Sequence, residues 1–237
     1  MTCEEFSIGF DLLYNNISSN QSPGLNDYEK SVFLTDAQKQ IVSELYRGNS
    51  IGQFSFESAE EVADYLNVLV RIYLKTPITG ESQIIPFFGV PDDFMFSIYE
   101  NCEINSYSDS CSFKNPKAVT VIPIKHDELG RIMENPFRGP NKTRVLRFYT
   151  GSDIPETSQT KDSDLYKQTI HLVSKYPIVK YTMKYLRKPE PIVLQNFTSS
   201  GLKIDGVSTK QTCRLPEPLH NLILKRAVEL AKAVWAA

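Results

Sequence analysis

The sequence predicts an α+β protein in which N-terminal amphipathic helices and a C-terminal helix pack with a mostly antiparallel β region. Residues 1–77 place apolar side chains at helical spacing, whereas residues 78–212 alternate apolar and polar side chains between frequent Gly and Pro. Residues 213–237 return to helical spacing. We therefore expect a helical region, a β-rich region with one short helix, and a C-terminal helix that packs back on the first helices.

The N-terminal region is expected to contain four helices. Apolar side chains recur every three or four positions over residues 4–17, and Asn26 or Asp27 can cap a second helix. Two capping boxes, at residues 35–38 and 58–61, predict further helices over about 36–46 and 62–73.

The β-rich region is expected to hold seven strands, because β-forming residues alternate with polar ones between turn signals. These strands cover residues 84–88, 94–104, 118–124, 143–149, 169–173, 178–186 and 191–194. A short helix is expected over about 127–134, and it should end before Asn135 because the residue before a proline disfavours helix. The polar segment 151–167 is expected to form a mobile loop.

The C-terminal helix has an apolar arc that covers about half of its circumference, wider than the ~100° that packing on one surface requires. The helix can lie between the sheet and the N-terminal helices. Alternatively, part of the arc, through Leu224, Val228 and Trp235, can dock a partner protein.

The total charge of −2 conceals an uneven distribution along the chain. Residues 1–64 hold eleven acidic and three basic side chains, a local net charge of −8, whereas residues 117–147 sum to +4. Residues 175–188 hold five basic side chains and no acidic one. Opposite charges on two parts of the chain suggest contact between the parts, or between copies of the chain.

Sequence motifs for chemistry are missing. There is no nucleophile elbow and no phosphate-binding glycine loop, and His126, His171 and His220 are too scattered to predict a metal site. The four cysteines form no CxxC motif, and reduced thiols are favoured over a Cys102–Cys111 disulfide, because no secretory signal or transmembrane run is present. We expect no catalytic residue, no metal and no cofactor, and therefore no enzyme.

Residues 137–148 combine four basic side chains with aromatic residues in a Pro- and Gly-rich segment. Such a segment can bind single-stranded nucleic acid, or its arginines can pair with carboxylates on a neighbouring acidic surface. A sequence pI of about 6.0 favours the second interpretation, because most free nucleic-acid binders are basic overall.

Several segments resemble a virion structural protein of the crAss-like phages that infect Bacteroidetes. The most specific match joins His126-Asp127-Glu128 to the run NPFRGPNK at 135–142. Further matching segments are DLLYNNI at 11–17, SNQSPGL at 19–25, YEKSVFLT at 28–35, YLRKPEPI at 185–192, and residues 215–231. Together they follow the family order over most of the chain.

This resemblance implies a ring-forming protein of the phage neck or tail, acting as a head–tail connector or portal adaptor. The implied partners are further copies of the chain, about twelve by analogy with portals, together with the portal and other ring proteins. DNA would pass through as non-specific cargo, without a membrane partner. The implied location is the virion, preceded by the host cytoplasm before assembly.

Interface candidates come from the basic segment and the last helix: Arg138, Lys142, Arg144, Arg147, Leu224, Val228 and Trp235. Two alternatives remain. One is a nucleic-acid-binding phage protein that acts through residues 137–148 and the 180–188 strand. The other is a hydrolase of unrecognised type, which would need a cluster of ionisable groups that the sequence does not offer.

Overall fold

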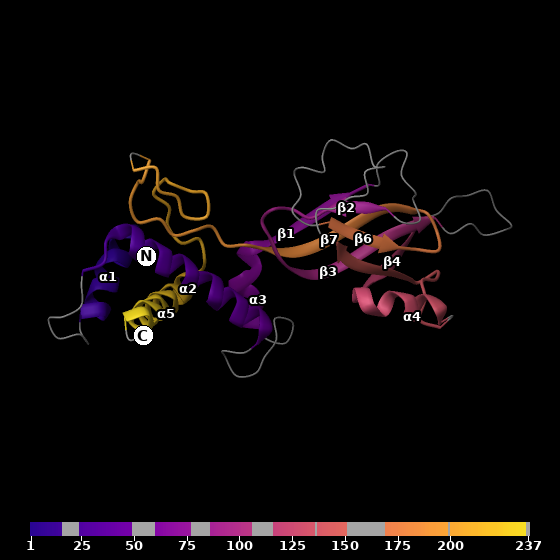
Figure 1. The fold of residues 1–237 in the computed structure, drawn as a ribbon, viewed down its shortest axis with the longest axis horizontal. Helices are drawn as coiled ribbons and strands as arrows, with labels where there is room; N and C mark the ends of the chain where they lie inside the picture. The colour runs from indigo at the N-terminus through magenta and orange to yellow at the C-terminus, as the bar shows by residue number, and fades with distance from the viewer. Residues whose placement is uncertain are drawn as a thin grey trace. The chain divides into compact units, whose positions relative to one another are not determined.

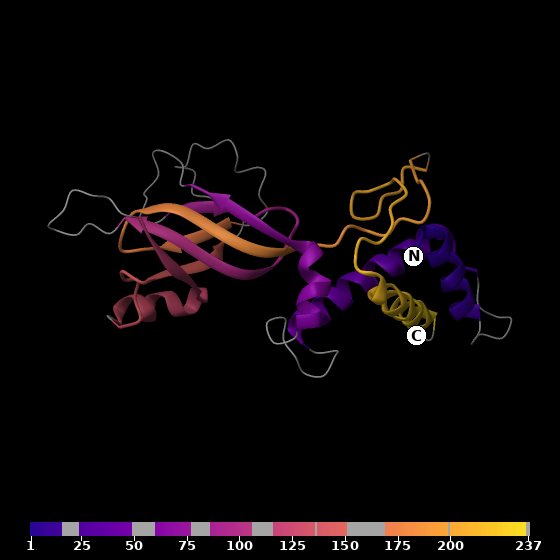
Figure 2. The same ribbon diagram turned by 180° about the vertical axis from the view of Figure 1, so that it is seen from behind.

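The computed structural model describes residues 1–15, 24–48, 60–76, 86–105, 116–135, 137–150, 169–198 and 200–235. The chain divides into two compact units (Figures 1 and 2). The helical unit comprises Met1–Leu69 and Lys188–Ala237, and the β unit comprises Val70–Arg187. The first boundary lies before the expected 77/78 because residues 70–75 form a strand of the sheet, and the second lies before 212/213 because residues 188–212 pack with the helical unit.

The described residues contain five α-helices and one seven-stranded sheet, which confirms the α+β fold class. Four helices belong to the helical unit: α1 Cys3–Asn15, α2 Asp27–Arg47, α3 Glu60–Leu66 and α5 Glu217–Trp235. The C-terminal helix α5 packs on both α1 and α2. Gly9 permits close approach of α1 to α5, because a Cβ there would lie 2.8 Å from Leu224 Cδ2.

Helix α2 is one continuous helix, so the predicted break at Thr35 is wrong. The helix begins at a capping box, in which Asn26 Oδ1 accepts from the Glu29 amide at 2.9 Å and Glu29 Oε2 accepts from the Asn26 amide. It ends at Gly48, whose left-handed φ of 75° suits glycine. Thr35 does not cap, because its hydroxyl is bonded to the backbone of Ile192.

The segment from residue 188 to 216 is held against α2 by side chains of that helix. Thr35 Oγ1 accepts from the Ile192 amide at 3.1 Å, and Ser31 Oγ accepts from the Leu194 amide at 3.0 Å. The strand predicted over residues 191–194 is therefore wrong. Apart from a single bridge between Val193 and Gln211, its amides bond to a helix instead of a neighbouring strand.

The β unit begins where a helix was predicted. Helix α3 ends at Leu66, a short 3₁₀ turn Asn67–Leu69 follows, and Val70–Lys75 forms strand β1, paired antiparallel with β7. The apolar residues from 62 to 73 fit a helical period, but Ile72 and Leu74 also fit the strand period of two. The local pattern therefore allows either a helix or a strand, and the hydrogen bonds to β7 favour the strand.

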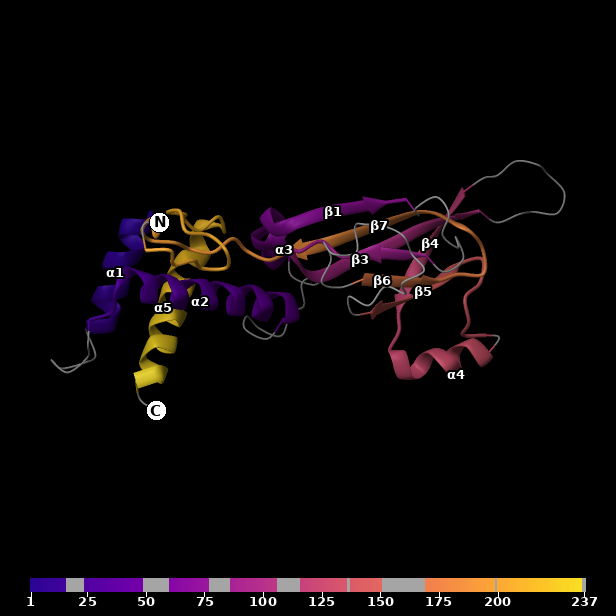
Figure 3. The same cartoon turned by 45° about the horizontal axis from the view of Figure 1, so that its top comes forward.

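The remaining strands are β2 Phe87–Gly89, β3 Phe94–Asn105, β4 Pro116–Pro123, β5 Arg144–Thr150, β6 Thr169–Val173 and β7 Ile178–Arg187. The sheet order is β1-β7-β3-β4-β5-β6-β2, and Figure 3 labels all of these strands except β2. Neighbouring strands are antiparallel except β4 and β5, which are parallel. Because a parallel pair needs a crossover, the chain between them carries the turn His126–Glu128 and helix α4 Leu129–Glu134.

The sheet curls, so that its first and last strands approach each other (Figure 1). The Tyr73 hydroxyl on β1 donates to the Gly89 carbonyl on β2 at 2.6 Å. The inner face holds the main core, which includes Val145, Tyr181 and Met183, while Leu146 and Phe148 point to the outer face beside α4. Alternation along β5 thus divides its side chains between two cores.

Cys102 lies in the main core as a free, buried thiol, and burial raises its pKa to about 12. Its proposed disulfide partner Cys111 and the loop 151–167 lie outside the described residues. In the described part of the chain, no helix combines the length and the apolar character that a membrane crossing requires.

Thr35→Val should lower the free energy of unfolding by about 1–3 kcal/mol, because the Ile192 amide would be left buried without its acceptor. The measurement is urea denaturation followed by circular dichroism. Gln40→Ala, on the exposed face of α2, is the control. Equal stability of Thr35→Val and the wild type would contradict this contribution of the bond between Thr35 and Ile192.

The free energy of unfolding should fall as pH drops below about 6.5, the ordinary pKa of histidine. His220 Nε2 donates to the Leu215 carbonyl at 2.8 Å, and its Nδ1 lies 2.9 Å from the Met1 amine. Burial, aided by the ammonium charge, lowers the pKa of His220, and burial also lowers that of His171. As the pH falls, each of these histidines is protonated in the unfolded chain before it is protonated in the folded chain. Each therefore lowers the free energy of unfolding by up to about 1.4 kcal/mol per pH unit.

His220→Gln should reduce this pH dependence, measured by denaturation at pH 7.5, 6.5 and 5.5. Asn221→Gln, an exposed neighbour on α5, should leave the dependence unchanged. An identical slope in His220→Gln and the wild type would contradict the assignment of His220.

Candidate assembly interface

The basic loop, residues 137–144, connects α4 to β5 and is built around Asn135. The Asn135 carbonyl accepts from the amides of Arg138 at 3.1 Å and Gly139 at 3.0 Å. Its side-chain Oδ1 accepts from the Phe137 amide at 2.9 Å. One asparagine thus fixes three successive amides in a tight turn.

The second half of the basic loop is fixed by Asn141 and Arg144. Asn141 Oδ1 accepts from the Thr143 amide at 2.8 Å, and the Asn141 amide donates to the Arg144 carbonyl at 3.0 Å. Arg144 Nη2 donates back to the Phe137 carbonyl at 2.7 Å. The guanidinium of Arg144 therefore closes the loop on itself, and the loop has its shape before any partner is bound.

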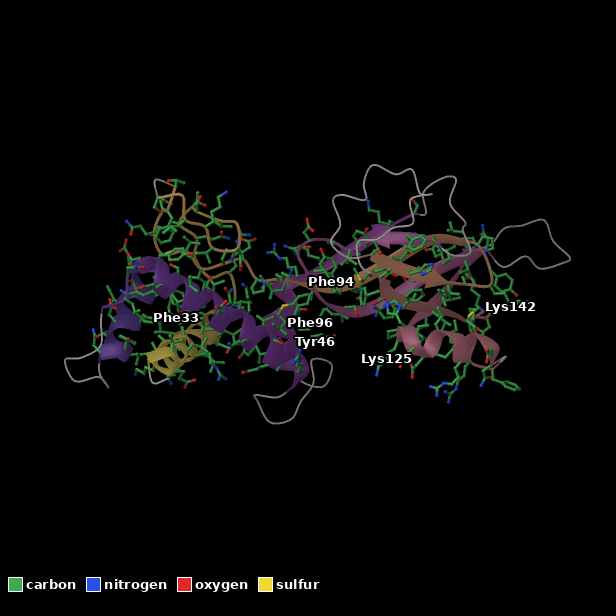
Figure 4. All side chains as sticks on the ribbon, in the orientation of Figure 1. Phe33, Tyr46, Phe94, Phe96, Lys125 and Lys142 are labelled. Atoms are coloured by element: carbon green, nitrogen blue, oxygen red, sulfur yellow. The ribbon has the colours of Figure 1, made fainter. Side chains whose placement is uncertain are left out.

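The side chains that this loop presents to solvent are Phe137, Arg138 and Lys142. Phe137 is 85% exposed, and both bases are exposed as well. Figure 4 labels Lys142 together with Lys125, an exposed base that precedes α4. A rigid loop with an exposed aromatic ring between cations is suited to protein contact.

Arg147 is the exception among the four predicted bases, because it points into the β unit. Only 5% of its surface is exposed, and its Nη2 lies 3.0 Å from Glu100 Oε1. The Tyr181 hydroxyl donates to Glu100 Oε2 at 3.0 Å, and the Arg147 guanidinium lies 4.2 Å from the centroid of the Tyr149 ring. Burial and the Glu100 carboxylate raise the pKa of Tyr181, so the tyrosine remains a donor.

The structure therefore places Arg147 in an internal network. The expectation that it contributes to a surface is corrected by the alternation of β5, which puts Arg147 on the inner face with Val145 and Tyr149. The sequence already contains this alternation, but the four basic residues were assigned to one surface because they lie close together along the chain.

Two of the three interface candidates on α5, Leu224 and Val228, are also buried. Leu224 and Val228 are 5% and 4% exposed, so packing within the helical unit accounts for this part of the apolar arc. They are corrected from candidate contact residues to core residues of the protomer. The side chain of Trp235 lies outside the described part of the chain.

The charge asymmetry persists when the chain is divided as the structure divides it. The helical unit has 15 acidic and 10 basic side chains, a net charge of −5, whereas the β unit has 13 and 16, a net charge of +3. Some acids of the helical unit are paired internally: Asp11 with Lys30 at 2.7 Å, and Glu44 with Arg226 at 3.0 Å. The units still carry opposite charges, as head-to-tail contacts would use.

Two exposed apolar surfaces were not predicted from the sequence. On α1, Ile8 and Leu12 are 62% and 67% exposed, one helical turn apart. On the edge strand β1, Ile72 and Leu74 are 64% and 51% exposed. The i, i+4 spacing of Ile8 and Leu12 could have predicted a second apolar stripe on the first helix.

In the β unit His126 and His171 both contact the Phe148 ring, whereas His220 belongs to the helical unit. His171 stacks on Phe87 with ring centroids 4.2 Å apart, and His126 contacts Phe148. Within the ranges that the structure describes, no group of three or more His, Cys, Asp and Glu side chains could hold a metal ion.

Comparison with known proteins gives matches over the whole chain. The family model for phage tail ring protein 3/4 matches residues 1–236. The chain is 40% identical over 236 residues to "Ring protein 3" of Bacteroides phage crAss001, covering 98% of this chain and 95% of that protein. It is 33% identical over 246 residues to "Ring protein 4/5" of the same phage, covering 99% and 94%.

Arg147→Met should destabilise the β unit by about 3–5 kcal/mol, because the Glu100 carboxylate would stay buried without its partner. Combining it with Glu100→Gln should recover part of this loss, as measured by thermal and urea denaturation. Lys180→Met is the matched control, since its 3.8 Å pair with Glu103 is partly exposed and should contribute under about 1 kcal/mol. Equal effects of the two single substitutions would contradict a special role for the buried pair.

Proposed function

The chain belongs to the phage tail ring protein 3/4 family of crAss-like phages, and we propose that it forms one ring of the head–tail connector. The family is structural, and the chain is a virion protein of this kind. In the proposed assembly about twelve copies surround the axis of the particle. The ring adapts the portal to the tail and lines a channel through which DNA passes as non-specific cargo.

The observation that carries this proposal is the match to ring proteins across both units of the chain. A relative that shared only the β unit would support the fold alone. Because the similarity spans the helical unit as well, we propose that the whole protomer builds the ring, rather than one unit serving as a detached accessory.

Neighbours of the proposed ring are the portal and other ring proteins. The two relatives carry the names of different rings of one phage, and both resemble this chain over nearly its full length. Related protomers in successive rings would let similar surfaces stack along the axis. Before assembly, the protomer would be in the host cytoplasm.

Lateral contacts in the ring would use the exposed part of the basic loop. Arg138 and Lys142 are free to meet carboxylates, whereas Arg144 is bonded to the loop itself. The opposite net charges of the two units support a contact in which different faces of successive protomers meet.

Nucleic-acid binding through residues 137–148 is a weaker second candidate. Phe137 and its neighbouring cations could stack on bases, but Arg147 is buried and Arg144 holds the loop. If this candidate were correct, purified protein would bind single-stranded DNA with an affinity that falls steeply with salt.

The test is to purify the full chain and measure its mass by size-exclusion chromatography with light scattering, alone and with the portal of its phage. Negative-stain images should show rings with a central opening. Antibody against the chain should label the neck or tail of purified virions. A chain that stays monomeric with the portal present and is missing from virions would refute the connector proposal.

A further inference from the structure

The exposed side of α1 forms an apolar groove in the helical unit. Among the described residues, its lining includes Ile8, Asp11, Leu12, Leu13 and Asn15. The other side of α1 is already used, because it packs on α5 and α2. Two apolar side chains that remain more than 60% exposed one helical turn apart indicate a contact surface, not a part of the protomer core.

The groove has charged neighbours of both signs: Asp11 is part of its lining, and Lys232 Nζ donates to the Leu13 carbonyl at 3.0 Å. Helix α1 carries Glu4, Glu5 and Asp11 and no basic residue. Asp11 Oδ2 accepts from Lys30 at 2.7 Å, yet the Asp11 side chain is still 47% exposed. The groove therefore combines apolar side chains with a half-exposed carboxylate that has one cation partner, and it can accept an apolar side chain flanked by a second cation.

The basic loop of the β unit carries this combination. Phe137 is the most exposed large apolar side chain in the described part of the protein, at 85%, and Arg138 is next to it. The Phe137 amide donates to Asn135 Oδ1, and the Phe137 carbonyl accepts from Arg144 Nη2. Because the backbone is held before contact, insertion of the ring would cost little conformational entropy.

We infer that Phe137 of one copy inserts into the α1 groove of the next copy, with Arg138 beside Asp11. This inference rests on the proposed ring function and specifies its lateral contact. The groove belongs to the helical unit and the loop to the β unit, so the contact joins two different surfaces and can repeat around a ring. A second copy of the chain is the proposed occupant, because each copy carries both the groove and the loop. The groove belongs to a unit with a net charge of −5 and the loop to a unit with a net charge of +3.

The first test is a double-mutant cycle on the self-association of the full chain, measured by sedimentation velocity. Leu12→Ala and Phe137→Ala should each weaken association about tenfold. The double variant should be little weaker than either single one, because both remove the same contact. Met133→Ala and Val234→Ala are matched controls, being 49% and 63% exposed but outside the groove and loop.

The second test establishes that the contact joins two chains. An Asn15→Cys chain is mixed with a size-tagged Lys142→Cys chain, both carrying Cys111→Ser, and a short bis-maleimide is added. Cys3, Cys102 and Cys213 are buried, so they should react little. A product that contains one tagged and one untagged chain is expected, and Phe137→Ala should reduce it.

Unchanged association in both single variants, additive losses in the double variant, or cross-links only within one chain would overturn the inference. So would a loss of binding to DNA or to another ring protein with self-association intact. A wild type that never self-associates in solution would overturn it too. The connector proposal would survive each of these results if the chain still labels rings in virions, so the two proposals can fail separately.

Discussion

The antiparallel pairing of β1 with β7 is the constraint on which the rest of the structure depends. The chain leaves the helical unit after Leu69 and returns at Lys188, and the Val70–Leu186 pair holds the two crossing points together. The helical unit can therefore combine α1 and α2 with the distant α5. Without this pairing, closing the helical core would require ordering a loop of more than a hundred residues, with a corresponding entropic cost.

The four basic residues between 138 and 147 lie in three different environments. Arg147 is desolvated and opposed by Glu100, so its charge contributes to the organisation of the core and is unavailable to a partner. The Arg144 guanidinium donates a hydrogen bond to the Phe137 carbonyl in its own loop. Arg138 and Lys142 remain hydrated, and their contribution to an interface depends on the charge that they meet.

Local patterns in the sequence predicted most helices and strands, and long-range contacts explain the differences. The period of apolar residues was sufficient for α1 and α5, but the Thr35–Gln38 capping signal was overridden by the bonds between Thr35 and Ile192, 157 positions away. Strand β1 was missed because its residues fit two periods and only pairing with β7 distinguishes them. The basic loop was recognised from composition, whereas which of its side chains face solvent depends on Asn135 and on the alternation of β5.

The curl of the sheet has a consequence for aggregation. An open sheet presents two edges whose unpaired backbone groups can recruit strands from other chains, a hazard for any protein that is produced in many copies at one place. Here one edge strand, β2, is only three residues long, and its Gly89 carbonyl is occupied by Tyr73. The other edge strand, β1, carries the exposed cations Arg71 and Lys75. Both features disfavour the addition of strands from other chains to this sheet.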